Sequence, residues 1–230
     1  MNIKKEKLFM NKNDEQILAL NKSALEKINL IQDMLNVEVL APTNLEDYDA
    51  MINTLNNLWE IAGVVGRRGD LEENFDFVQP IPYTIIAQGD KYFTYTRLEG
   101  SGESRLHGKS SIGIGGHQNE VEHAWNFEHI LAVNNSRELE EEVTIKTDDG
   151  IEITNHYEIT KESAIIGLLY NEKTEVDSVH LGVLNVIVIP ENWTVESKET
   201  DTLEGSFKTK EEIEKLDLEN WSKSALTILT

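Results

Sequence analysis

Two long apolar runs in the C-terminal half constrain the fold more than any other feature of this sequence. Residues 163–170 read SAIIGLLY, and residues 179–190 read VHLGVLNVIVIP. A strand with one solvated face alternates apolar and polar side chains, whereas these runs are almost continuously apolar. Such runs are typical of β-strands whose two faces are both covered by other layers. We therefore expect a layered α/β or α+β domain.

Helical and hairpin patterns precede these runs. Residues 13–37 carry aliphatic side chains at helical spacing. Residues 41–63 suit a second helix, capped by Thr43 or Asn44. Residues 81–98 read as two strands joined by a tight Gly-Asp turn.

Further elements are expected later in the chain. Residues 127–143 suit a helix, and residues 141–159 contain a second hairpin pattern around an Asp-Gly turn. A helix is expected to begin at Thr209, which forms a capping box with Glu212. A last amphipathic helix contains Trp221.

The residue pattern changes from helical spacing to strand-like runs at about Phe75, which suggests two parts. We expect a helical N-terminal extension over residues 1–65 and a larger domain over residues 66–230. Two isolated helices bury too little apolar surface to be stable alone. The extension should therefore pack on the larger domain or join two copies of the chain in a homodimer.

The charge balance limits the partners of this chain. It has 42 Asp and Glu against 21 Lys and Arg, for a formal net charge of −21. Such a charge repels nucleic acid and anionic membranes, so neither is an expected partner. The sequence has no cysteine, no apolar signal core at its start and no apolar run near the roughly 18–20 residues of a membrane span. We expect a cytoplasmic protein.

An acidic run, SRELEEEVTI at residues 136–145, is the clearest chemical feature. On a helix, Glu138, Glu141 and Glu142 share one face, whereas Glu140 points away. Like charges on one face repel each other, and divalent cations with a preference for hard oxygen ligands, such as Mg²⁺ or Mn²⁺, would relieve that repulsion. A solvated acidic surface is the alternative interpretation of the run taken alone.

The segments around the acidic run resemble the Nudix hydrolases. The family signature is G-x5-E-x7-R-E-U-x-E-E-x-G-U, where U is apolar, and the RELEEEVTI stretch from Arg137 matches its second half. The paired glycines Gly115 and Gly116 resemble those that precede the family helix. The similarity extends over roughly residues 75–230 and is greatest to a group of Nudix-type phosphoesterases. It implies a Nudix-like α/β/α sandwich with a mixed sheet.

The first half of the signature departs from the family pattern. The signature glycine falls on His123 and the first glutamate on His129, while Glu128 is one position away. Thr144 replaces the late glycine. The second half of the signature, which holds the metal ligands of the family, is therefore matched closely. The first half, which holds the glycine loop, is matched only weakly.

The resemblance implies a metal-dependent enzyme that cleaves a phosphoanhydride bond in a nucleoside diphosphate linked to another group. Glu138, Glu141 and Glu142 would act as ligands of Mg²⁺ or Mn²⁺, together with the backbone carbonyl of Gly116. Arg137 would pair with one of these three residues, which we call the box glutamates, to fix its rotamer. Glu138 is the first choice for the general base, and Glu175 the second.

Several other residues could bind the substrate. Arg97, Arg105 and Lys109 are cations suited to phosphate oxygens, in a chain with few basic residues. His117 follows the glycine pair, and His180 lies in an apolar run that belongs to the similar region. The alternatives are surface charges for the cations and a hydrogen-bonded core residue for the strand histidine.

Two other functions fit the sequence. The departures from the signature suit a Nudix-like domain that binds a nucleotide without hydrolysing it. Crowded like charges on one helix face oppose that interpretation, because a pure nucleotide sensor gains nothing from them. A scaffold role for the N-terminal helices is compatible with either function.

Overall fold

The computed structural model describes residues 11–98, 107–198 and 203–229. The strands are β1 (Gln16–Asn21), β2 (Gly63–Arg67), β3 (Phe77–Gln88), β4 (Lys91–Arg97), β5 (Ser110–Ser111), β6 (Val143–Lys146), β7 (Ala164–Leu169), β8 (His180–Val188), β9 (Thr194–Ser197) and β10 (Leu203–Thr209). The helices are η1 (Lys12–Asp14), α1 (Lys22–Lys27), α2 (Leu30–Leu35), α3 (Leu45–Ala62), α4 (Arg68–Glu72), α5 (Phe127–Glu142), α6 (Tyr157–Thr160), α7 (Glu175–Ser178), α8 (Lys210–Ile213) and α9 (Asn220–Leu226). Among the residues described, no helix is both long and apolar enough to cross a bilayer.

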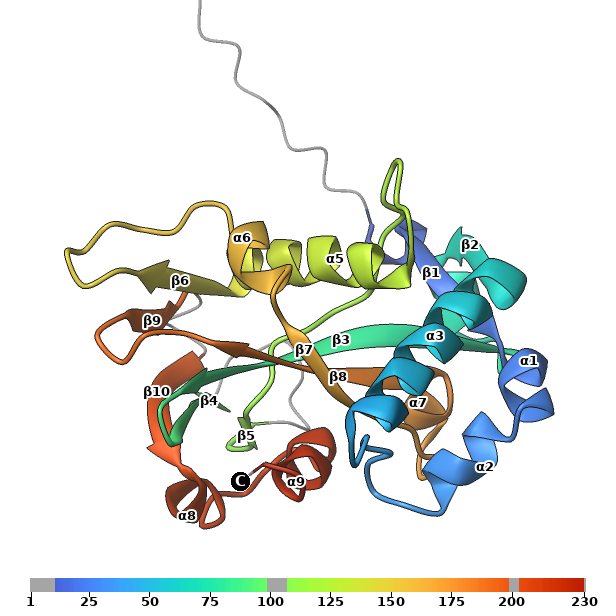
Figure 1. The fold of residues 1–230 in the computed structure, drawn as a ribbon. Helices are drawn as coiled ribbons and strands as arrows, with labels where there is room; N and C mark the ends of the chain where they lie inside the picture. The colour runs from blue at the N-terminus through green and yellow to red at the C-terminus, as the bar shows by residue number, and fades with distance from the viewer. Residues whose placement is uncertain (1–10, 99–106, 199–202, 230) are drawn as a thin grey trace, which may run out of the picture.

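The two apolar runs form adjacent strands inside a mixed sheet. Strand β8 pairs in parallel with β3 and antiparallel with β7, and β3 continues into the antiparallel hairpin with β4 (Figure 1). Gly89 takes a φ of 60° at the hairpin turn, a conformation that glycine adopts without a steric penalty. The predicted strands at 81–98 and in both apolar runs are therefore confirmed.

Helices cover this sheet on both faces. Tyr83 and Ile85 of β3 pack with Ala225 of α9, whereas the next residue, Ile86, packs with Leu139 of α5. This alternation is what a strand buried on both sides requires. The expected α/β/α arrangement of the Nudix fold is confirmed, with α3 and α5 on one side and α9 on the other (Figure 1).

The helix predicted over residues 13–37 is wrong in its first half. Ile17, Leu18, Ala19 and Leu20 lie in β1, which pairs with β2 and β3. All four of these side chains are buried. A helix on the surface of a sheet would expose some of four consecutive side chains, whereas a strand between two others can bury them all. Two short helices, α1 and α2, follow the strand.

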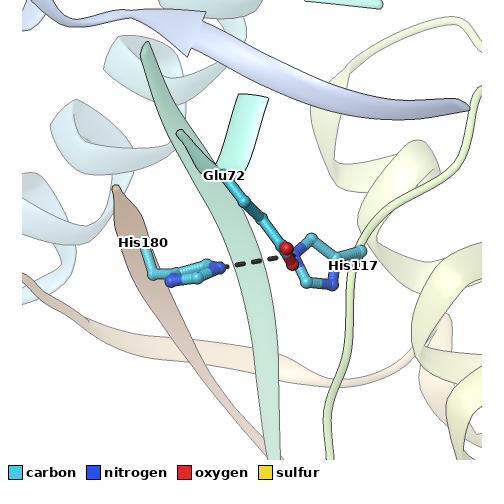
Figure 2. A group of neighbouring side chains, drawn as sticks. All are labelled: Glu72, His117 and His180. Carbon is cyan, nitrogen blue, oxygen red and sulfur yellow. Dashed lines mark hydrogen bonds and ion pairs between the residues drawn. The ribbon is translucent and has the colours of Figure 1, made fainter. Parts of the chain in front are cut away.

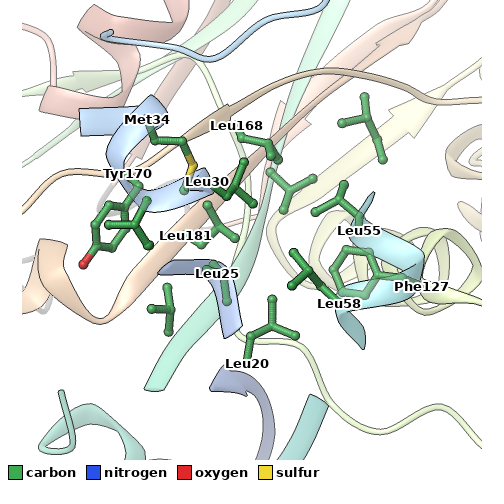
Figure 3. Close-up of a cluster of buried hydrophobic side chains, with 14 of the residues drawn as sticks. Leu20, Leu25, Leu30, Met34, Leu55, Leu58, Phe127, Leu168, Tyr170 and Leu181 are labelled. Carbon is green, nitrogen blue, oxygen red and sulfur yellow. The ribbon is translucent and has the colours of Figure 1, made fainter. Parts of the chain in front are cut away.

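The described part of the predicted extension, residues 11–65, shares one core with later parts of the chain. Leu25 and Leu58 pack in the same cluster as Phe127 and Leu181, as Figure 3 shows. The expected boundary at residue 65 falls inside β2, which belongs to the same sheet through β1. The extension is thus not purely helical, because its two strands complete one edge of the sheet.

Other local expectations had mixed outcomes. The side chain of Asn44 caps α3, and Thr209 and Glu212 form the predicted capping box of α8. The second predicted hairpin is confirmed at its turn, where Gly150 has a φ of 79° and Lys146 and Glu152 form an antiparallel bridge, but the segment after the turn extends no further as a strand, and β6 pairs with β9 along its length. The apolar side chains of β6 thereby join the core beside α5.

Candidate active site

One wall of the site is the glycine segment, residues 113–117, which packs against the central strand β3. Thr84 of β3 and Ile114 exchange backbone hydrogen bonds of 2.7 and 2.9 Å. A Cβ atom on Gly115 would lie 1.8 Å from the carbonyl oxygen of Pro82, so the close approach of the two backbones requires glycine. This packing brings Gly116 to a defined position beside α5.

Helix α5 presents Glu138 to this glycine segment. Asn126 caps the helix by accepting a hydrogen bond from the backbone N–H of His129. Leu139 packs into the core, and the adjacent Glu138 turns toward the segment. A Cβ atom on Gly116 would lie 2.4 Å from Oε1 of Glu138. The Glu138 carboxylate therefore lies directly against the Gly116 backbone, and the residue is only 8% exposed.

Arg137 joins the glycine segment to the helix. Its Nη2 donates to the carbonyl oxygen of His117 at 2.6 Å and also lies 2.6 Å from Oε1 of Glu138. Its Nη1 lies 3.5 Å from Oε1 of Glu141. The predicted pairing of Arg137 with a glutamate of the box is confirmed. Burial raises the pKa of Glu138, and the positive charge of Arg137 opposes that rise.

A cavity of about 900 Å³ opens beside these residues. It collects side chains from η1, α4, β3, α5, the segment around α7 and the start of α9. The sequence-predicted site residues in its lining are Lys109, Gly116, His117, Glu138, Glu141, Glu142 and His180. The fold therefore brings most of the predicted residues to one space, although they are distributed over more than 70 positions of the sequence.

Arg97 and Glu175 are placed differently from the prediction, and a third predicted residue is not described. The Nε atom of Arg97 lies 2.7 Å from Oε1 of Glu219, and its guanidinium group lies over the ring of Tyr95, outside the cavity lining. Arg105 lies outside the described residues. Glu175, the second choice for the general base, is exposed and does not line the cavity.

Sequence reasoning missed several charged residues at this site, among them Lys12, Arg68 and Glu72. Lys12 and Arg68 line the cavity, and Glu72 lies beside it, within ion-pairing distance of His117. Arg68 places its Nε atom 2.8 Å from Glu72 and its Nη1 atom 3.3 Å from Glu15. The sequence positions of these residues do not show which distant side chains lie beside them, so only the packing of η1 and α4 reveals that they reach this site.

His117 and His180 face each other at the cavity wall. Their Nε2 atoms are 3.3 Å apart, and their ring planes meet at 67°. Burial, together with the positive charges of Arg68 and Arg137, lowers the pKa of His117 to about 3. Burial also lowers the pKa of His180. Both rings are therefore neutral at neutral pH, with nitrogen lone pairs available as acceptors or ligands.

A known crystal structure shares this architecture. The crystal structure of Tm1382, a protein assigned to the Nudix hydrolases, superposes with a TM-score of 0.67 and 26% sequence identity. The superposition covers 94% of this chain and 98% of Tm1382, so it includes the N-terminal strands and helices. No family model matches the chain. The fold and the residues of the cavity define a member of the Nudix superfamily.

A curated relative specifies the family further. Protein YmaB of Bacillus subtilis (strain 168) is 35% identical over 224 residues, covering 96% of this chain and 100% of YmaB. Since the similarity spans both proteins almost from end to end, the chain belongs to the same family as YmaB within that superfamily.

Proposed function

We propose that this protein is a metal-dependent hydrolase that cleaves a phosphoanhydride bond in a nucleoside diphosphate linked to another group. The observation that carries the proposal is the convergence of Glu138, Glu141, Glu142 and Gly116 on one cavity, in a chain of the Nudix superfamily. An acidic cluster on an ordinary surface would not be joined to a glycine segment that contacts one of its carboxylates.

The residues present fit a divalent cation such as Mg²⁺ or Mn²⁺. All the proposed ligands are hard oxygens, from three carboxylates and the backbone carbonyl of Gly116. The absence of a side chain at Gly116 leaves room for the Glu138 carboxylate beside the backbone. A cation bound there would neutralise phosphate oxygens and lower the pKa of bound water.

The side chains of this protein would position the substrate and accept a proton. Lys12, Arg68 and Lys109 line the cavity and offset part of its negative charge, so that a polyanionic substrate can enter. Glu138 is the proposed general base, because its buried carboxylate lies at the cavity wall against the Gly116 backbone. Arg137 would hold that carboxylate in one rotamer through its ion pair.

A substrate panel tests the proposed function. The full chain is incubated with nucleoside diphosphate derivatives and Mg²⁺ or Mn²⁺, and released nucleotide products are separated by ion-exchange chromatography. We expect turnover of at least one derivative that is lost with excess chelator. Tight nucleotide binding in chelator, with no hydrolysis under either metal, would instead indicate a nucleotide sensor.

We expect the substitution Lys109→Ala to raise KM by about 10-fold with a smaller change in kcat. A cation that contacts phosphate equally in the ground state and the transition state contributes uniform binding, and its loss appears in KM. Steady-state kinetics with the substrate found in the panel measures both constants. Lys223 offers a matched control, because both lysines place Nζ 3.8 Å from Asp217 but Lys223 does not line the cavity. Equal effects of the two substitutions would contradict a role for Lys109 in substrate binding.

We expect the substitution Gly116→Ala to lower kcat by about 100-fold in a folded protein. The added methyl group would lie 2.4 Å from the Glu138 carboxylate and must displace it. A displacement of about 1 Å at a reacting centre can cost roughly 100-fold in rate. Gly69→Ala is a control outside the cavity, where the nearest heavy atom would be Cβ of Asn13 at 3.1 Å. Unchanged turnover in Gly116→Ala, with thermal unfolding measured in parallel, would show that the position of Glu138 is not critical.

A further inference from the structure

Beside the box glutamates, a second group of possible metal ligands meets at the edge of the cavity. Glu72 of α4, His117 of the glycine segment and His180 of β8 place one ligand atom each within 4.8 Å of one another (Figure 2). We propose that these three side chains form a separate site for a transition-metal ion, with Zn²⁺ as the best-suited ion. The inference rests on the three side chains and does not depend on the hydrolase activity proposed above.

The backbone contact of His180 selects the nitrogen that can bind a metal. Its Nδ1 atom lies 2.7 Å from the carbonyl oxygen of Val176, so Nδ1 carries the proton and donates it to that oxygen. The Nε2 atom is then left with a free lone pair, directed toward His117. Histidine ligands of metals usually make such a contact from the other ring nitrogen, which fixes both tautomer and orientation.

The spacing of the nitrogens fits a single tetrahedral ion. Two imidazole nitrogens bound to zinc at about 2.0–2.1 Å, at a tetrahedral angle, are separated by about 3.3–3.4 Å. The Nε2 atoms of His117 and His180 are 3.3 Å apart. Oε1 of Glu72 lies 3.6 Å from Nε2 of His117, so a small side-chain adjustment would complete the set. Without a metal, the Nε2–H group of His117 can donate to Nε2 of His180 and to Oε1 of Glu72, and a metal ion would replace that proton between the same three atoms.

The ligand types distinguish this group from the box. Two imidazoles and one carboxylate suit Zn²⁺, whereas a set of oxygens alone suits Mg²⁺ or Mn²⁺. Arg68 lies close to the group and its charge opposes a cation. However, Arg68 pairs with both Glu15 and Glu72, and these carboxylates balance its charge. The pairing with Arg68 also orients the Glu72 side chain.

The site would remain open on one side. His117 and His180 both line the cavity, and three protein ligands leave a fourth tetrahedral position for water or for an oxygen of a bound phosphate. His117 directly follows Gly116, so the two proposed metal positions share one wall of the cavity. The second ion would therefore be available to bind an anionic ligand that also reaches the box.

Metal titration of the full chain tests this site. Chain freed of metal with a chelator and then desalted is titrated with Zn²⁺ in competition with a chromophoric zinc indicator, and with Co²⁺ by absorption spectroscopy. We expect one tight Zn²⁺ per chain and an intense Co²⁺ spectrum typical of four-coordinate nitrogen and oxygen ligation. His180→Ala should weaken Zn²⁺ binding by more than about 100-fold, because loss of an outer-shell partner alone costs about 10- to 100-fold.

Matched variants separate this site from non-specific binding and from the box. Glu73→Gln and His123→Ala alter exposed residues of the same types and should leave Zn²⁺ affinity unchanged. The double substitution of Glu141 and Glu142 to Gln should also retain the tight ion. Thermal unfolding without metal checks every variant, and Glu72→Gln on the partly exposed helix α4 provides a second ligand test if a histidine variant does not fold. The inference is overturned if the wild-type chain binds no tight Zn²⁺, or if affinity survives in His180→Ala and Glu72→Gln.

Discussion

Replacement of Glu138 by Gln should lower kcat by roughly 10³-fold while the protein stays folded. The amide keeps the size of the side chain but removes both a proposed anionic ligand and the proposed proton acceptor, and loss of general-base catalysis alone typically costs about 10²–10⁴-fold. The fold should survive because Arg137 keeps its hydrogen bond to His117 and its contact with Glu141. Turnover at saturating Mg²⁺ and Mn²⁺, together with thermal unfolding, measures both effects.

Glu140→Gln is the matched control on the same helix. The Glu140 side chain is exposed, and its carboxylate accepts hydrogen bonds from Ser136 Oγ and from the backbone N–H of His156. The carbonyl oxygen of a glutamine can accept both. We expect kcat to stay within about twofold of wild type. Comparable turnover in both variants, whether high or low, would remove the basis for assigning the catalytic role to Glu138.

Deletion of residues 1–65 should prevent the remaining chain from folding. The deletion removes β1, which pairs with β3, and the side chains of Leu25, Leu55 and Leu58 from a shared core. Truncation of a single buried leucine to alanine costs about 2–5 kcal/mol, and a whole domain is stable by only about 5–15 kcal/mol. Loss of several such side chains therefore exceeds the available stability. Circular dichroism and solubility of residues 66–230, compared with the full chain, measure the outcome.

Point substitutions within helix α3 test the same contribution of the N-terminal part to the core. Leu58 is 2% exposed and Ile61 is 76% exposed, although both lie in α3. Leu58→Ala should lower the free energy of unfolding by about 2–5 kcal/mol, whereas Ile61→Ala should change it little. A soluble 66–230 chain with the melting temperature of the full protein would mean that the N-terminal part is dispensable. The expected homodimer through this part remains a prediction, which the mass of the full chain in solution tests.

Local patterns were sufficient for the elements whose neighbours in sequence decide their structure. The hairpin at residues 81–98, the box helix α5 and the strands of both apolar runs were predicted correctly, because periodicity and turn residues report directly on local backbone geometry. The face shared by Glu138, Glu141 and Glu142 follows from helical spacing alone. The pairing of Arg137 with a box glutamate is a contact of neighbouring residues, and it too was predicted from sequence.

The tertiary structure decided what depends on contacts between distant segments. Ile17 to Leu20 can be buried in a helix or in a strand, and only pairing with β2 and β3 makes them a strand. Arg68 and Glu72 are spaced as a helical i, i+4 ion pair, but that spacing does not show which distant residues lie beside them, and only the packing of α4 brings them beside His117 and His180. The sequence by itself determined the chemical identity of the box and the layered fold. The packing of β1, α4 and β8 decided which side chains form the cavity wall, and with them the second proposed metal site. The physical reason is that residues far apart in the sequence meet only through the packing of their elements, which no local sequence pattern encodes.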